Sequence, residues 1–329
     1  MNDTVKISAI VTAYNVEKHI GRALESVLSQ RSTADEIIVV DDGSTDATAD
    51  RIKAYGDQVR YIYQDNGGAS LARNRGIGAA QCEWIAFLDG DDEWLPPHLE
   101  QQRELLQRYP DLVWSTGNYF RCLCWENRKA PDIPANRIRK HLSSRDRLED
   151  YLKHYVHGLT GHSDTMVIKR SVLINTGLFT PGQKRANDLD MWWRIAYQHA
   201  AIGYIAEPLA VHHMDVTGSI SRRYSEIELY RDLIDHHLIL ATEQNRLTAL
   251  KPCATRILQF WMRGQLFAGN GKGIRKMLDH FDDLIPRRII LWFRLLTLFP
   301  RVTAIGCHGV SKIIRKLRLR RQLVRKPNS

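Results

Sequence analysis

Cysteine is scarce in this 329-residue sequence, and the five cysteines form no recognisable metal-binding pattern. Only Cys122 and Cys124 lie close together, and no second pair completes a zinc site. We therefore expect reduced thiols in a cytoplasmic protein. Residues 1–4 begin neither a basic nor an apolar stretch, so no signal peptide is predicted. No uncharged apolar run of about 18 residues occurs, so no transmembrane helix is predicted.

Glycine-rich phosphate loops are also missing. Neither GxGxxG nor GxxxxGK(S/T) follows the first apolar run, which spans residues 6–13. This absence disfavours the nucleotide-binding folds that hold phosphate on such a loop.

Four short apolar runs alternate with helical periodicity in the first 90 residues and predict a parallel sheet. Short loops join each run to a helix, which is typical of an α/β fold with helices on both faces of the sheet. The carboxyl ends of parallel strands share one edge, so we expect a binding site there. The predicted strands span residues 6–13, 36–40, 59–63 and 84–88, and their polar ends are residues 14–15, 41–42, 65–66 and 89–91.

The rest of the chain predicts a mixed region followed by a helical one. We place the boundary between a domain at 1–215 and a helical region at 216–329, because the composition changes after residue 221. Residues 118–144 show weak periodicity and predict a loop or hairpin. Further helices are expected at 99–109, 145–155, 170–175, 187–199, 226–242, 254–268 and 273–280, and further strands at 112–116, 165–168, 202–206 and 209–212, the last two separated by Pro208.

An acidic stretch directly follows the fourth predicted strand. Asp89, Asp91 and Asp92 fall within four residues, and carboxylates this close repel one another unless a hard cation lies between them. In an ideal strand Asp89 and Asp91 would share a face, and Gly90 would let the backbone bend toward a ligand. The stretch therefore predicts a divalent metal site. The simpler interpretation is an acidic turn that caps a helix beginning near Pro96.

Five short motifs occur in the order and spacing of the family 2 glycosyltransferases, which the chain resembles over residues 6–215. Each motif is weak alone, but the set is specific. The resemblance implies a GT-A fold and the use of a nucleoside-diphosphate sugar, as in bacterial members of this family. The motifs are VTAYN at 11–15, VDDGSTD at 40–46, GGASLARNRG at 67–76, FLDGDD at 87–92 and NDLDMW at 187–192.

The resemblance also implies roles for the matching positions. Asp89 and Asp91 would be the DxD pair that holds Mn²⁺ or Mg²⁺ on the diphosphate, and Asp188 would be the general base. The family usually has Glu-Asp where this chain has Asn187-Asp188, so the departure affects only the first position. Tyr14 would lie against a pyrimidine ring. The full set implied to contact the nucleotide sugar is Thr12, Tyr14, Asp42, Arg73 and Asp89, with Asp42 bonded to the base.

Two further residues are candidates for contacts with the acceptor or with phosphate. His212 follows the last predicted strand and could reach the metal or the phosphates, although such histidines are more often structural. Trp192 could offer a ring face to an acceptor sugar, although one of Trp192 and Trp193 is expected in the core. For Arg73, helix packing is the alternative to a place near the nucleotide.

The residue types fit transfer of a sugar with inversion at its anomeric carbon. A metal ion with oxygen ligands can neutralise a departing diphosphate, and one carboxylate can take the proton of an acceptor hydroxyl. We expect transfer from a nucleoside-diphosphate sugar to a glycan or lipid-linked acceptor, in cell-surface polysaccharide biosynthesis.

Two alternative functions stay open. A nucleotidyltransferase on a related sheet would need an activating lysine and a glycine-rich loop, and neither is evident in the sequence. A non-catalytic protein that binds nucleotide sugars or membranes would not need the complete metal and base positions.

Acidic residues are absent from 284–329, where twelve Lys and Arg lie, although the formal net charge of the whole chain is only +10. Residues 309–324 place apolar side chains roughly along one stripe, which suits an anionic membrane surface. A helical cap with a solvated basic face and nucleic-acid binding are the alternatives, and the second lacks a recognisable motif. We expect no nucleic-acid partner, and we expect residues 286–326 to bring the protein to the inner face of the cell membrane.

Overall fold

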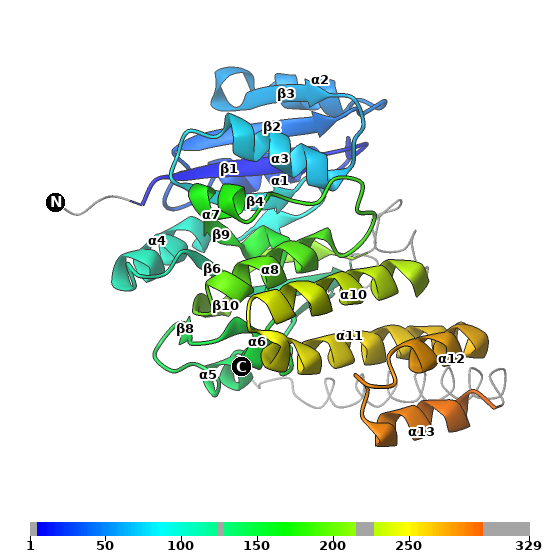
Figure 1. Ribbon diagram of the computed structural model, residues 1–329. Coiled ribbons are helices and arrows are strands. Elements are labelled where there is room, and N and C mark those ends of the chain that lie inside the picture. The colour runs from blue at the N-terminus through cyan, green and yellow to red at the C-terminus, as the bar shows by residue number, and fades with distance from the viewer. Residues whose placement is uncertain (1–4, 124–127, 215–226, 299–329) are drawn as a thin grey trace, which may run out of the picture. The chain divides into compact units, whose positions relative to one another are not determined.

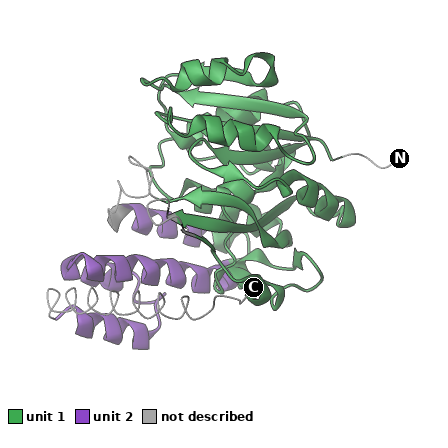
Figure 2. Cartoon of the chain, turned by 180° about the vertical axis from the view of Figure 1, so that it is seen from behind, with its two compact units in different colours: residues 1–225, 240–246 green, residues 226–239, 247–329 purple. Residues whose placement is uncertain are grey.

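The computed structural model describes residues 5–123, 128–214 and 227–298. The chain divides into two compact units (Figure 2). Unit 1 comprises residues 1–225 and 240–246, and unit 2 comprises residues 226–239 and 247–329. The predicted boundary at 215/216 falls outside the described residues. Within the described part of the chain, no helix is both long enough and apolar enough to cross a membrane.

Unit 1 is built on one sheet whose first half is parallel (Figure 1). β1 pairs in parallel with both β2 and β4, and β2 pairs in parallel with β3. Nearly every side chain of β1 and β4 is buried, which requires cover on both faces of the sheet. The four strands predicted from the sequence are confirmed: β1 spans Ile7–Ala13, β2 Glu36–Asp42, β3 Arg60–Gln64 and β4 Trp84–Asp89.

Helices between these strands provide the cover. α1 buries four apolar residues at the spacing of one helical face. α3 lies against β1 at Gly76, where a Cβ would come within 2.5 Å of Ile10 Cγ2. Only glycine permits this approach of helix to strand. The helices span Ile20–Leu28 (α1), Thr48–Lys53 (α2) and Ala69–Ala79 (α3).

The second half of the sheet is mixed. β9 lies between β4 and β6 and is antiparallel to both, whereas β6 and β10 are parallel to each other. The strand order is β3-β2-β1-β4-β9-β6-β10-β5. The strands span Glu93–Trp94 (β5), Trp114–Leu123 (β6), Val167–Lys169 (β9) and Ile202–His213 (β10), and helices α4, α7 and α8 span His98–Arg108, Arg170–Asn175 and Asn187–Gln198.

Two sequence predictions in this half are corrected. Residues 202–213 form one strand, because Pro208 lies at an irregularity of the strand register where its missing N–H is tolerated. The predicted helix 145–155 is wrong in its first part, where β8 (Arg147–Leu148) pairs with β10, and only α6 (Tyr151–Tyr155) is helical. Asp150 begins α6 by accepting hydrogen bonds from two backbone N–H groups.

The region predicted as loop or hairpin contains a hairpin. β6 continues to Leu123 and pairs in antiparallel fashion with β7 (Arg128–Pro131). A short helix, α5 (Ala135–Arg139), follows within the same region.

The helical region predicted after residue 221 is confirmed in its described part. Its core contains Ile234, Leu258 and Met277, contributed by three different helices. α11 begins earlier than expected, at Leu247, and contains Pro252 as its sixth residue. The helices span Ile227–Glu243 (α10), Leu247–Phe267 (α11), Gly271–His280 (α12) and Arg287–Leu296 (α13).

Candidate active site

The acidic stretch forms a tight turn at the carboxyl end of β4. Thr12 and Asp89 lie side by side in the register of β1 and β4. β4 ends at Asp89, and the Asp92 N–H donates to the Asp89 carbonyl (3.0 Å), which closes the turn through Asp91. The expectation that Asp89 and Asp91 share a strand face is therefore wrong, because the strand ends before Asp91.

Gly90 is fixed by the neighbouring strand. Its N–H donates to the Thr12 carbonyl (2.8 Å), and a Cβ at this position would lie 2.9 Å from that oxygen. The glycine is thus required for contact with β1. The acidic residues do not cap α4, which begins after Pro97 without a side-chain cap.

Asp89 is held by two side chains from other elements. Arg73 Nη2 in α3 donates to Asp89 Oδ1 (2.7 Å), and Thr12 Oγ1 donates to the same oxygen (3.2 Å). Burial opposes the charge of Arg73, but the carboxylates of Asp89 and then Asp188 outweigh it and raise the pKa of Arg73. The fold therefore brings Asp188 within electrostatic reach of the β4 turn, although about a hundred residues separate them in the sequence.

Asp188 lies in the first turn of α8, where the helix dipole favours an ionised carboxylate. Its Oδ1 accepts the N–H of Leu189 (2.8 Å). Asn187 accepts the Asp188 N–H through its side-chain oxygen (2.8 Å) and donates to Ser70 Oγ (3.3 Å). Asn187 thereby ties the start of α8 to α3, and Ser70 and Arg73 belong to the same helix.

The residues expected around the nucleotide lie at the ends of β1 and β2. Tyr14 is 48% exposed, so its side chain is accessible to a ligand. Asp42 is buried and already engaged: its carboxylate accepts the N–H groups of Gly67 (2.9 Å) and Gly68 (2.8 Å) and a hydrogen bond from Gln64 (2.7 Å). Asp42 thus shapes the loop that leads into α3.

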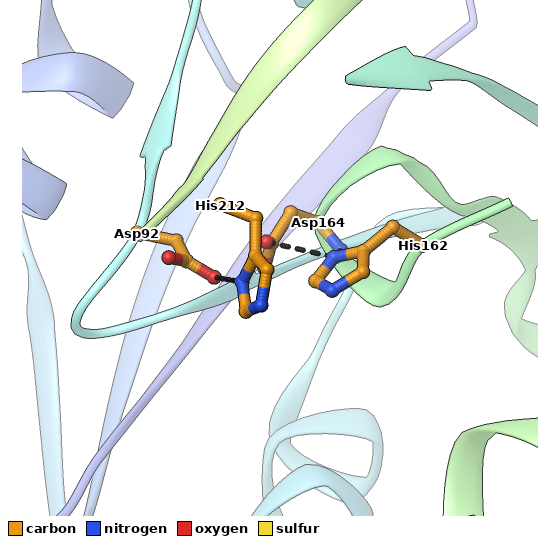
Figure 3. A group of neighbouring side chains, drawn as sticks. All are labelled: Asp92, His162, Asp164 and His212. Carbon is orange, nitrogen blue, oxygen red and sulfur yellow. Dashed lines mark hydrogen bonds and ion pairs between the residues drawn. The ribbon is translucent and has the colours of Figure 1, made fainter. Parts of the chain in front are cut away.

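Two aspartate–histidine pairs lie beside the β4 turn (Figure 3). His212 Nδ1, at the end of β10, lies 2.8 Å from Asp92 Oδ2. His162 Nδ1 lies 2.9 Å from Asp164 Oδ2, and both residues belong to the segment before β9. One ligand atom from each of the four side chains lies within 4.8 Å of the others. Of this group, the sequence pointed to His212 as a candidate site residue and to Asp92 as part of the acidic stretch.

Two carboxyl groups at this edge have raised pKa values. Burial, with the carboxylates of Asp89 and Asp164, raises the pKa of Asp91 to about 7. Burial also raises the pKa of Asp92 well above its usual value. The edge therefore holds more carboxylates than its neighbouring cations neutralise, and an added divalent cation would relieve the repulsion.

The two histidines differ in charge. Burial lowers the pKa of His212 to about 4, with a contribution from the adjacent His162. Burial also opposes the charge of His162, but the Asp164 carboxylate outweighs it and raises the pKa of His162 to about 9. His162 is therefore the positively charged member of the two.

The donor atoms at the turn suit a hard cation. Asp89 Oδ2 has no partner among the described residues, and Asp91 adds a second carboxylate. Carboxylate oxygens are the ligands that Mg²⁺ prefers, and Mn²⁺ accepts the same type. The residues present therefore fit the divalent metal that the sequence predicted.

Trp192 does not line the site. It is 2% exposed, and its ring packs edge-on against Phe179 with 5.8 Å between ring centroids. Trp193 is fully buried and packs against Tyr155. The predicted acceptor contact through Trp192 is thus left without support, because the ring has no free face.

His162 and Asp164 were missed because their signal in the sequence is weak. They lie two residues apart in a segment without periodicity, just before the short strand β9. A histidine followed two residues later by an aspartate is too common to indicate a site. Only the pairing of β9 with β4 places them beside Asp89.

The sequence of residues 8–176 matches the family described as Glycosyl transferase family 2. Among curated relatives, the uncharacterized glycosyltransferase RP339 of Rickettsia prowazekii (strain Madrid E) is 27% identical over 69% of this chain and 70% of its own length. TuaG of Bacillus subtilis (strain 168), named for teichuronic acid biosynthesis, is 38% identical over 30% of this chain and 41% of its own length.

The solved structures agree with the sequence match. Residues 1–349 of S. aureus TarS, solved in complex with UDP-GlcNAc, superpose with a TM-score of 0.70 at 19% identity, covering 92% of each chain. At this identity the likeness shows the fold, which is the GT-A fold expected from the sequence. Because the family match covers more than half of the 329 residues, the chain belongs to glycosyl transferase family 2 and is a transferase.

Proposed function

We propose that the protein transfers a sugar from a nucleoside-diphosphate sugar to a hydroxyl group of a glycan or lipid-linked acceptor, with inversion. The observation that carries this proposal is the position of Arg73, which pairs with Asp89 while its pKa is also raised by Asp188. One guanidinium thus links the predicted metal site with the predicted base. Family membership supports sugar transfer over a nucleotidyltransferase or a non-catalytic binding protein.

The donor would bind at the carboxyl ends of β1, β2 and β4. The exposed side chain of Tyr14 suits stacking on the base, and Thr12 and Asp42 order the strand ends on either side. Asp89 and Asp91 would hold Mn²⁺ or Mg²⁺, which when bound supplies positive charge that neutralises the departing diphosphate.

Asp188 is the proposed general base. A carboxylate at this position can accept the proton of an acceptor hydroxyl as that oxygen attacks the anomeric carbon. A single base with no second carboxylate acting as nucleophile gives one displacement, and therefore inversion. Arg73 keeps the region around Asp89 and Asp188 from accumulating uncompensated negative charge.

Two substitutions separate the proposed roles. In Asp91→Asn, we expect metal-dependent binding of a nucleoside diphosphate to weaken by about tenfold or more, because a carboxylate ligand is lost. In Asp188→Asn, we expect unchanged donor binding and a fall in turnover of roughly 10²-fold or more, because the base is lost. Calorimetry with UDP and Mn²⁺ measures the first, and release of nucleoside diphosphate from a panel of nucleotide sugars measures the second.

Asp57→Asn is the matched control, because Asp57 is exposed and lies outside the site. Equal nucleotide affinity of wild type and Asp91→Asn would contradict the metal assignment. Full turnover by Asp188→Asn would contradict the assignment of the base. Binding without turnover across the whole panel would favour the non-catalytic alternative.

We also propose that α13 attaches the protein to an anionic membrane surface on the cytoplasmic side, near its acceptor. Four exposed apolar residues follow one another at helical spacing along and just beyond α13: Leu291, Trp292, Leu295 and Leu298. Arg287 and Arg288 begin the helix, and α13 contains no acidic residue. Apolar and basic side chains together are typical of helices that lie in a membrane interface. The predicted amphipathic segment 309–324 lies outside the described residues.

The place of the reaction in the cell is part of the same proposal. The name of TuaG assigns that relative to teichuronic acid biosynthesis, which supports a role for this chain in cell-surface polysaccharide synthesis. An acceptor carried on a membrane lipid would explain why a glycosyltransferase needs a membrane-facing helix.

A further inference from the structure

The rings of His162 and His212 lie next to each other at the edge of the site. Their centroids are 4.6 Å apart, and Tyr119 packs on His162 with 4.8 Å between centroids. Each ring directs Nδ1 toward its own aspartate, as Figure 3 shows. Tyr119 and the two aspartates therefore fix the orientation of both rings.

The Nε2 atoms of the two rings are turned away from the aspartates and toward the same side (Figure 3). Within residues 5–123, 128–214 and 227–298, neither Nε2 atom has a hydrogen-bond partner. Both side chains are partly exposed, His162 by 19% and His212 by 29%. The pair thus presents unused hydrogen-bonding groups on side chains that solvent reaches in part.

Asp164 connects His162 to the predicted metal site. It is fully buried, and its Oδ1 accepts the backbone N–H of Asp89 (2.9 Å) while its Oδ2 faces His162 Nδ1. Its own carbonyl accepts the indole N–H of Trp94 (2.6 Å). One carboxylate therefore fixes both the start of the β4 turn and the ring of His162.

The charge of His162 indicates the class of ligand. Asp164 holds the ring as an imidazolium, and Asp89 and Asp188 contribute in the same direction. An imidazolium with Nδ1–H directed at a carboxylate has only Nε2–H left to donate. Such a donor suits an anionic oxygen, and charge-assisted hydrogen bonds to phosphate are about twice as strong as neutral ones.

We propose that His162 binds a phosphate oxygen of the donor's diphosphate, and that Asp164 is a positioning residue that acts through His162. This inference rests on the proposed function, because it needs a donor with a diphosphate at the β4 turn. His162 would then stabilise the charge that collects on the diphosphate as the sugar leaves.

Calorimetry on the full chain with Mn²⁺ tests the contact. We expect His162→Gln to weaken binding of UDP and of inorganic pyrophosphate by roughly tenfold or more, because a charge-assisted hydrogen bond is lost. Binding of uridine, which lacks phosphate, should be unchanged. His236→Gln is the matched control, because His236 is a histidine in α10, outside the site.

A double-mutant cycle tests the role of Asp164. Asp164→Asn keeps an oxygen that can accept the Asp89 N–H but loses the charge that faces His162. If Asp164 acts through His162, the double variant His162→Gln/Asp164→Asn should bind UDP no more weakly than His162→Gln alone. Circular dichroism and thermal unfolding show whether each variant is folded, and His162→Lys, which restores a positive charge, should recover part of the affinity.

The outcomes separate this inference from the proposed function. If wild type binds neither UDP nor pyrophosphate, both fail. If wild type binds both and folded His162→Gln binds them equally well, only the role of His162 fails. If His162→Gln loses Mn²⁺ binding in the absence of nucleotide, the ring is a metal ligand and the phosphate contact is overturned. Fully additive effects of the two substitutions would overturn the positioning role of Asp164.

Discussion

At the scale of single residues, His98 shows how a buried histidine makes stability depend on pH. It is fully buried at the start of α4, and its ring stacks on Trp94 with 4.4 Å between centroids. Its Nδ1 lies 3.2 Å from the Leu209 carbonyl, which also accepts the N–H of Leu95. Burial lowers the pKa of His98 to about 4, so the folded protein holds this ring neutral.

The lowered pKa predicts loss of stability in mild acid. The unfolded chain binds a proton on His98 below a pKa of about 6.5, whereas the folded protein does so only near 4. The contribution of neutral His98 to the unfolding free energy is therefore complete above pH 6.5. It falls by about 3 kcal/mol as the pH drops from 6.5 to 4. We expect His98→Phe to show a shallower fall in unfolding free energy over this range, measured by urea denaturation at several pH values.

The quantity to compare is the slope of the unfolding free energy against pH. Its absolute value is less informative, because His98→Phe also changes packing against Trp94. The Leu209 carbonyl keeps the Leu95 hydrogen bond in the variant. His236→Gln, which removes an exposed histidine of α10, is the control for the loss of a histidine. A slope in His98→Phe equal to that of wild type would show that His98 does not titrate in this way.

The sequence could indicate some site residues and not others, for a physical reason. Asp89 and Asp188 stand in short motifs whose order along the chain is itself informative. Asp92 also stands in one of these motifs, but its contact with His213 spans about 120 positions, and the contact of Asp164 with Asp89 spans about 75. No local pattern predicts contacts over such separations. The contact of Asp42 with the base stays a prediction, whereas its bonds to Gly67 and Gly68 depend on the course of the loop and could not be predicted.

At the scale of elements, α3 is a helix in close contact with the sheet. Gly76 faces Ile10 in β1, whereas a Cβ added to Gly78, two residues later in the same helix, would have no neighbouring atom within 4 Å. The two glycines thus differ in surroundings while sharing one helix. Because α3 also carries Ser70 and Arg73, the packing of α3 against β1 determines how these side chains reach the site.

This difference predicts opposite effects of the same substitution. Gly76→Ala should lower the unfolding free energy by about 1–3 kcal/mol, because its methyl group would overlap a branched side chain in the core. Gly78→Ala should raise it by about 0.5–1 kcal/mol, because alanine loses less backbone entropy on folding. Chemical denaturation of the two variants beside wild type measures both. Equal effects would mean that α3 can move away from β1 at little cost.

Strands and helices with clear periodicity were predictable, and those governed by distant partners were not. The four parallel strands are short apolar runs and were found within two residues at each end. β8 is only Arg147–Leu148, and it is a strand because β10 supplies the pairing. Pro208 suggested a break, but the neighbouring strand tolerates it through a shift in register.

At the scale of the whole molecule, the predicted active site and the excess of basic residues belong to different units. The predicted site lies in unit 1, and the excess of basic residues lies in 284–329, which belongs to unit 2. Composition alone revealed this separation, because charge counts need no knowledge of contacts. It could not reveal that α13 packs through Phe293 and leaves Leu291 and Trp292 exposed.

The exposed face of α13 predicts how the whole protein partitions between water and membrane. Burying a large apolar side chain contributes about 1.5–3 kcal/mol, and each basic residue near an anionic surface adds about 1 kcal/mol. We expect the full chain to co-sediment with vesicles of phosphatidylcholine and phosphatidylglycerol, less so at high salt, and little with phosphatidylcholine alone. Replacing Leu291, Trp292 and Leu295 together by Gln should weaken this binding by more than about tenfold.

Ile239→Gln is the matched control, because Ile239 is a similarly exposed apolar residue on α10. It should bind vesicles as wild type does. Wild-type protein that stays in the supernatant with anionic vesicles would contradict membrane attachment altogether. A triple variant that binds as well as wild type would remove α13 from the contact and leave residues 299–329 as the segment to test. Loss of binding in the triple variant alone, with thermal unfolding unchanged, would assign the contact to this face, because a general defect in folding would also alter the unfolding temperature.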